Sequence, residues 1–132
     1  FMYRILLIDD DEDEAEILQT AITEIDRSTL FNYISNCDEA LKFLKQTKIP
    51  VPDIILLDIS MPRMNGLDCL KEIKRLDHLK NVPVIIYSNS GASLDVSEAM
   101  TRGAQVFWKK PNVYLDLVKK LKELIHSVFP LH

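Results

Sequence analysis

Five short apolar segments alternate with five segments of helical periodicity, and this alternation constrains the fold more than any other feature of the chain. The apolar segments are residues 3–8, 30–35, 54–57, 82–87 and 105–108. They are too short for buried helices, and a continuous run such as Ile54 to Leu57 is typical of a parallel strand covered on both faces. Strands that alternate with helices predict a parallel sheet, with right-handed crossovers that place helices on both faces. The sequence therefore predicts an α/β fold.

The segments between the strands carry apolar residues at helical spacing. The second helix is expected to begin at Asn36, with Glu39 three positions later as a capping partner, and to run to about residue 47, before Pro50. The fourth helix, over residues 92–102, has the thinnest apolar face. The apolar positions are Leu18, Ala21, Ile22 and Ile25 in the first helix, and Leu67, Leu70, Ile73 and Leu76 in the third. They are Leu94, Val96, Ala99 and Met100 in the fourth, and Leu117, Val118, Leu121, Leu124, Ile125 and Val128 in the fifth.

Composition narrows the class of protein. A chain of 132 residues with 47% hydrophobic and 27% charged residues fits one domain over residues 1–132, and no output domain is expected after the last helix. The net charge of −4 argues against nucleic acid as a partner. No apolar run approaches about 18 residues, so no membrane span is expected. Cys37 and Cys69 lack metal-ligand spacing, and we expect both to be reduced in a cytoplasmic protein.

Polar side chains follow the predicted strands at the points where the strands end. Asp9 and Asp10 end the first strand, Asp58 the third and Ser88 the fourth, while the fifth leads to Lys110. In open α/β sheets, ligands bind beyond the carboxyl ends of the strands, where the strand order reverses. These side chains are therefore expected to converge on one edge of the sheet.

Such a group of side chains favours metal-assisted phosphoryl chemistry. Carboxylates packed together repel each other and would favour taking up protons, a conflict that a divalent cation removes. Mg²⁺ binds one or two carboxylates together with water and phosphate oxygens. One carboxylate can then act as a nucleophile toward a phosphoryl donor, while the metal and a lysine neutralise charge on the transferred group.

Taken together, these motifs resemble the receiver domain of two-component response regulators, of the single-domain kind to which the chemotaxis response regulator belongs. The match runs from about residue 3 to residue 128. The matching motifs are Ile5-Leu6-Leu7-Ile8-Asp9-Asp10, Asp58-Ile59-Ser60-Met61-Pro62 with Gly66, Ser88, and Lys110-Pro111. The resemblance implies a flavodoxin-like, doubly wound fold, with a five-stranded parallel sheet in the order 2-1-3-4-5.

The resemblance also implies a metal set. Asp58 matches the phosphoacceptor and would contribute to Mg²⁺ binding. Asp10 would bind Mg²⁺ directly and Asp9 through water, and the backbone carbonyl of Ser60 would supply another oxygen.

Three further residues match positions that act on the phosphoryl group. Lys110 would contact its oxygens and Ser88 would donate a hydrogen bond to them. Phe107 matches the aromatic residue that reorients when this hydroxyl moves. The two departures from the family pattern are Asn89 after Ser88, and the pair Trp108 and Lys109 before Lys110. They leave every reacting group in place.

The function implied is that of a bacterial, cytoplasmic response regulator in a phosphorelay. It would accept a phosphoryl group on Asp58 from a sensor or hybrid histidine kinase. Signalling would run through contact with a downstream target protein or through a histidine phosphotransfer protein. Such a chain would catalyse only its own phosphorylation and dephosphorylation and would not be an enzyme in the ordinary sense.

Two rival functions remain open. A phosphohydrolase of the haloacid-dehalogenase type would use Asp9 and Asp11, although the usual threonine after this pair and a cap domain are missing. A receiver-like interaction module that is never phosphorylated is the second.

A solvated helix start accounts for Glu12, Asp13 and Glu14, because carboxylates favour the positive end of a helix dipole. The side chains interpreted as structural are Tyr87, Trp108, His78 and His126.

Overall fold

The computed structural model describes residues 3–59, 66–89 and 93–128, the side chains of 93–95 excepted. Five strands and five α-helices alternate along the chain. Their bounds are β1 Arg4–Ile8, α1 Glu12–Ile25, β2 Leu30–Ile34, α2 Cys37–Leu44, β3 Ile54–Leu57, α3 Gly66–Lys74, β4 Val84–Ser88, α4 Ser93–Thr101, β5 Val106–Lys109 and α5 Tyr114–Val128.

The five strands form one parallel sheet in the order β2-β1-β3-β4-β5. The predicted α/β fold, with the strand order 2-1-3-4-5, is confirmed. β1 lies between β2 and β3, so the strand order reverses next to β1. The carboxyl ends of β1 and β3 are neighbours, because Ile8 pairs with Leu57.

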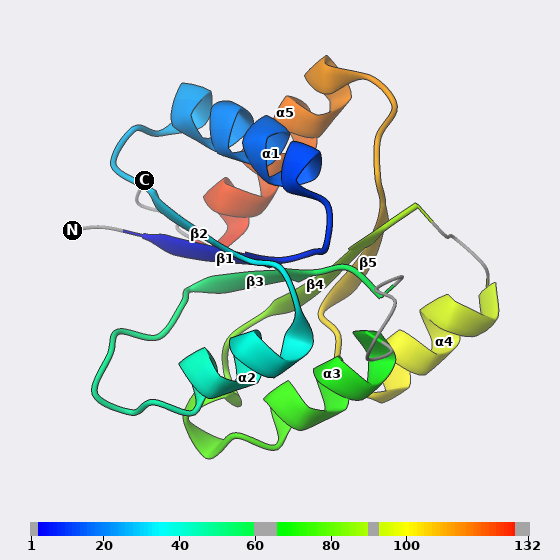
Figure 1. The fold of residues 1–132 in the computed structure, drawn as a ribbon. Coiled ribbons are helices and arrows are strands. Elements are labelled where there is room, and N and C mark those ends of the chain that lie inside the picture. The colour runs from blue at the N-terminus through cyan, green and yellow to red at the C-terminus, as the bar shows by residue number, and fades with distance from the viewer. Residues whose placement is uncertain (1–2, 60–65, 90–92, 129–132) are drawn as a thin grey trace.

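Two layers of helices cover the sheet, α1 and α5 on one face and α2, α3 and α4 on the other (Figure 1). Alternate residues of each strand feed the two layers, because successive side chains of a strand point to opposite faces. In β1, Ile5 and Leu7 pack with α1 and α5, whereas Leu6 and Ile8 pack with α2 and α3. This burial on both faces explains why the central strands read as continuous apolar runs.

Side-chain caps begin the first two helices. The Asn36 side chain accepts a hydrogen bond from the backbone N–H of Glu39 at 2.9 Å, as the capping pattern predicted. Asp11 caps α1 in the same way, accepting from the N–H of Asp13 at 3.0 Å. The acidic residues of the first turn therefore stabilise the start of α1. They also follow shortly after Asp9 and Asp10 in the chain.

Several element boundaries differ from the sequence predictions. α2 ends at Leu44, before the expected residue 47, and α3 ends at Lys74, so Leu76 lies outside it. A short 3₁₀ helix, Asp77–Leu79, follows and was not predicted. In α4, Met100 is 46% exposed and does not belong to the apolar face that was assigned to it.

The two cysteines were expected to be reduced, and this expectation is wrong for the structure. Cys37 and Cys69 form a disulfide that joins the first turn of α2 to the middle of α3, with their Cα atoms 6.0 Å apart. Both residues are buried in the layer of α2, α3 and α4. The sequence hid this pairing because 32 positions separate the two residues, and only the packing of α2 beside α3 brings them together.

None of the helices in the described part of the chain combines the length and apolar character needed to cross a bilayer.

Candidate functional site

The ends of three strands bring polar side chains to one edge of the sheet. Asp9 follows β1 directly and donates its backbone N–H to Ile34 O of β2 at 3.2 Å. Asp58 follows β3 and donates its N–H to Ile8 O of β1 at 2.9 Å. Lys110 follows β5 and donates its N–H to Ser88 O of β4 at 2.8 Å. The sheet ladder therefore extends up to the residues that carry the polar groups and holds their backbones in place.

Asp9, Asp10 and Asp58 lie together in the structure. One carboxylate oxygen from each can be chosen so that the three lie within 4.8 Å of one another. Asp9 and Asp58 are buried, Asp58 being 4% exposed, whereas Asp10 is exposed to solvent. Three carboxylates at this spacing are a suitable set of hard oxygen ligands for a divalent cation.

Lys110 bridges the carboxylates from the side of β5. Its ammonium donates to Asp9 Oδ2 at 2.9 Å and lies 3.9 Å from Asp58 Oδ2. The other oxygen of Asp9, Oδ1, accepts the backbone N–H of Asp11 at 3.0 Å. Both oxygens of Asp9 therefore have partners within the protein.

Burial dominates the electrostatics of Asp9. Desolvation raises the pKa of Asp9 to about 6, against the hydrogen bonds from Lys110 and Asp11, and the Asp58 charge adds a smaller push in the same direction. Mutual repulsion between the carboxylates is thus the minor cause of the raised pKa. Burial alone would lower the pKa of Lys110, but the hydrogen bond to Asp9 and the surrounding carboxylates raise it overall. Lys110 is therefore a charged ammonium at neutral pH.

The remaining residues singled out from the sequence are placed as follows. Ser88 is fully buried at the end of β4. Phe107 is half-buried in β5 and packs against the layer of α2, α3 and α4. Ser60 lies outside the described residues, so the proposed role of its carbonyl stays a prediction. Asp11 caps α1 and is exposed, and it is not a member of the carboxylate group found among the described residues.

Sequence reasoning missed the involvement of Tyr87. Its ring lies under the Lys110 ammonium, 5.4 Å from the nitrogen to the ring centroid. The signal in the sequence was an aromatic residue at the end of an otherwise aliphatic strand, Val84-Ile85-Ile86-Tyr87, immediately before Ser88.

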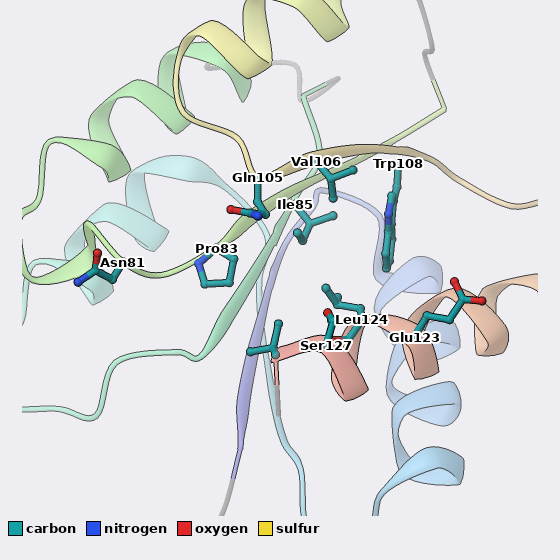
Figure 2. Close-up of a pocket in the computed structure, with 10 residues that line it drawn as sticks. Asn81, Pro83, Ile85, Gln105, Val106, Trp108, Glu123, Leu124 and Ser127 are labelled. Atoms are coloured by element: carbon teal, nitrogen blue, oxygen red, sulfur yellow. The ribbon is translucent and has the colours of Figure 1, made fainter. Parts of the chain in front are cut away.

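A separate groove lies between the edge strand β5 and α5 (Figure 2). Val106 and Trp108 line it from β5, and Leu124 and Ser127 line it from α5. None of the three clustered carboxylates is among its lining residues. The carboxylate group and this groove are therefore separate features of the described structure.

The family and relatives of the chain agree with this site. The model of the "Response regulator receiver domain" family matches residues 5–122, so the chain belongs to that family. The chemotaxis protein CheY of Thermotoga maritima is 36% identical over 108 residues, which cover 82% of this chain and 85% of that protein. The two-component response regulator ORR1 of rice, Oryza sativa subsp. japonica, is 33% identical over 113 residues, covering 82% of this chain. The chain spans 49% of the length of that rice protein.

A solved structure gives the same architecture. The CheX-CheY-BeF₃-Mg²⁺ complex from Borrelia burgdorferi contains a chain 27% identical to this one, with a TM-score of 0.77, covering 93% of this chain and 89% of that one. The flavodoxin-like receiver fold that the resemblance implied is therefore confirmed. Members of this family are signalling proteins of two-component systems, and the rice relative is itself a two-component response regulator.

Proposed function

We propose that this receiver domain accepts a phosphoryl group on Asp58 in a Mg²⁺-dependent reaction and signals through protein contact. The single observation that carries the proposal is that Asp58 lies close to the carboxylates of Asp9 and Asp10 and to the ammonium of Lys110. The Borrelia CheY structure with Mg²⁺ and a fluoroberyllate supports it, because that protein is a family member with the same fold.

The carboxylates suit the cation. Asp10 and Asp58 would hold Mg²⁺ directly, Asp9 would bind through water, and we propose that the backbone carbonyl of Ser60 completes the protein ligands. When bound, the metal neutralises charge on the transferred group. The chain supplies one exposed and two buried carboxylates for it.

The residues of the chain perform the transfer itself. A carboxylate oxygen of Asp58 attacks the phosphorus, and an acyl phosphate forms as the bond from phosphorus to the leaving atom of the donor breaks. The leaving group keeps that electron pair. Lys110 is 3.9 Å from Asp58 Oδ2 and would donate to the phosphoryl oxygens, with Ser88 donating from the end of β4. Since the reaction needs little further covalent chemistry, positioning and charge supply most of the rate.

The donor that we propose is a histidine kinase of the sensor or hybrid type. A histidine phosphotransfer protein or a target protein would receive the signal. We further propose that residues 1–132 act as one receiver domain in a bacterial cytoplasm and that its catalysis is limited to its own phosphorylation and dephosphorylation. The single continuous sheet and the family match support the one-domain proposal.

Intact mass spectrometry tests the proposed reaction. The protein is incubated with acetyl phosphate, with Mg²⁺ or with excess chelator, and the gain of one phosphoryl group is measured. We expect the gain with Mg²⁺ only, no gain for Asp58→Ala, and an unchanged gain for Asp13→Ala, which removes an exposed carboxylate on α1. An Asp58→Ala variant that is phosphorylated as well as the parent protein would show that the acceptor is another residue. A parent protein that is never phosphorylated would favour the unphosphorylated interaction module.

A further inference from the structure

Tyr87 lies beside the proposed site but belongs to the opposite face of the sheet from Phe107. It is 2% exposed and packs in the layer formed by α1 and α5. The three residues before it in β4 are aliphatic, so the ring brings the only hydroxyl and the only π-face of residues 84–87. A residue of this kind in a buried aliphatic strand calls for a partner for both its ring and its hydroxyl.

The ring has its partner in Lys110. The ammonium nitrogen lies 5.4 Å from the ring centroid, within the range in which the ring quadrupole attracts a cation. The same nitrogen donates to Asp9 Oδ2 at 2.9 Å. A π-face attracts the charge without accepting a directional hydrogen bond, so donors of the ammonium stay available for oxygens on the side of Asp58.

Glu14 of α1 acts electrostatically on the hydroxyl of Tyr87. Burial, the charges of Glu14 and Asp9, and a hydrogen bond with the Glu14 side chain all raise the pKa of Tyr87 well above its usual value. The phenol is therefore neutral at physiological pH. Glu14 also lies near enough to Lys110 to raise the pKa of the ammonium. Tyr87 thus connects the first turn of α1 with the lysine that follows β5.

We propose that Tyr87 is a positioning residue for Lys110, holding the ammonium over its ring between Asp9 and Asp58. The contribution to phosphorylation rests on the proposed function, but the contact itself does not. The ring supports the lysine from the side of α1 and α5, and packing in that layer holds the ring in place. When Asp58 carries a phosphoryl group, the ammonium can turn its donors toward the new oxygens without leaving the ring.

Nuclear magnetic resonance tests the contact in metal-free, unphosphorylated protein. The side-chain ε-methylene protons of Lys110 are expected to be shifted upfield by the ring current, and to show cross-relaxation with the ring protons of Tyr87. Both signals should be lost in Tyr87→Leu and kept in Tyr87→Phe, which retains the ring. Tyr33→Leu is the matched control, because Tyr33 is a half-buried ring of the same layer near Asp9 and Asp10. A parent protein in which Lys110 shows neither signal overturns the proposal, whether or not Tyr87→Leu folds.

The rate of phosphorylation by acetyl phosphate, with Mg²⁺ affinity measured alongside, tests the consequence. We expect Tyr87→Leu to slow phosphorylation by about three- to thirtyfold at saturating Mg²⁺, the range that a cation–π contact supplies, with Mg²⁺ affinity unchanged. Tyr87→Phe should restore most of the rate. If Tyr87→Leu slows the reaction no more than Tyr33→Leu does, the positioning role is wrong. If the parent protein is not phosphorylated at all, the proposed function fails while the resonance experiment still decides the contact.

Discussion

Asp9 and Asp10 are adjacent in the chain and differ sharply in burial. Asp9 is fully buried and has both oxygens engaged, one by Lys110 and one by the N–H of Asp11. Asp10 is exposed, and a carboxylate oxygen of it can still lie within 4.8 Å of oxygens of Asp9 and Asp58. Because Asp10 is exposed, whereas Asp9 would have to give up its partners, Asp10 should bind a cation more readily than Asp9.

The first prediction follows from that difference. Asp10→Asn should weaken Mg²⁺ binding by at least about tenfold. Loss of an outer-shell partner already costs about that much, and loss of a direct ligand should cost no less. Asp13→Asn should have little effect, because Asp13 lies on the exposed first turn of α1. Titration calorimetry at one ionic strength compares the two variants, which carry the same change of charge. Equal losses of affinity would mean that only the general field of the acidic run matters.

The second prediction concerns pH and Asp9. Because burial raises the pKa of Asp9 from 3.8 to about 6, the folded state binds a proton that the unfolded state has released between these two values. The metal-free protein should therefore lose stability through Asp9 as the pH rises from about 4 to about 6, by at most about 3 kcal/mol. Asp9→Asn should lack this component.

Urea unfolding with excess chelator measures this component as the difference in unfolding free energy between the parent protein and Asp9→Asn. The difference should shift against the parent protein across that pH range and then stay constant up to pH 8. A difference that is flat, or that moves in favour of the parent protein, would show that Lys110 compensates the burial of Asp9 fully.

At the scale of elements, two local features link the layer of α2, α3 and α4 to the proposed site. Gly66 begins α3 directly against the end of β3, and the Cys37–Cys69 disulfide joins α3 to α2. A Cβ added at Gly66 would meet Ile59 Cα closely and would lie 2.6 Å from Asp58 O. A helix start at this position therefore requires glycine for the close approach of two backbones.

The third prediction is that Gly66→Ala displaces the backbone that carries Asp58. We expect a loss of about 1–3 kcal/mol of unfolding free energy, typical of overpacking, together with weaker Mg²⁺ binding. Lys71→Ala, an exposed substitution in the same helix, should stay within about 0.5 kcal/mol. Denaturant unfolding and calorimetry measure both quantities. A Gly66→Ala variant as stable as the parent protein would mean that α3 can shift without cost.

The fourth prediction concerns the disulfide. The bridge closes a loop across 32 positions, for which the chain-entropy model gives about 3–4 kcal/mol of stabilisation. Reducing agent should therefore lower the urea midpoint of the parent protein. The double variant Cys37→Ala with Cys69→Ala should unfold at the same midpoint with and without reductant. Thiol titration of the unfolded, non-reduced parent protein that finds two free thiols would contradict the bridge.

At the scale of the whole molecule, α4 is the helix with the weakest attachment among the described side chains. Ala99 is buried, Val96 is half-buried, and Met100 is exposed. Arg102 pairs with Asp68 of α3 at 2.9 Å and with Glu98 at 3.3 Å, and exposed pairs of this kind contribute little. Elements with few buried apolar contacts are the ones that open or shift most easily.

The fifth prediction is that a phosphoryl group on Asp58 shifts the surface of α4, β5 and α5. Ser88 and Lys110 would move toward the new oxygens, and Phe107 would fill the space behind Ser88, which biases an equilibrium that already exists. Amide hydrogen exchange over residues 89–115 should change when a beryllofluoride mimic is added. Ser88→Ala should keep phosphorylation and lose this change. Equal protection with and without the mimic in the parent protein would contradict the switch while leaving the phosphoacceptor chemistry standing.

The sequence by itself determined the order of strands and helices, because apolar runs of four to six residues alternate with helical periods over the whole chain. It also placed Asp9, Asp10, Asp58, Ser88 and Lys110 at strand ends, where a parallel sheet must bring them to one edge. Helix ends were less predictable. α2 ends well before Pro50, since packing rather than the next proline decides where a short helix stops.

Only the tertiary structure decided which of these groups touch and which residues support them. Pairing of β1 with β3 and of β4 with β5 puts Lys110 against Asp9, 101 positions away. It also places Lys110 over Tyr87 and joins Cys37 to Cys69. These contacts cross from one element to another, and local spacing carries no information on them. The burial that raises the pKa of Asp9 is likewise a property of the folded layers, because desolvation exists only once the helices cover the sheet.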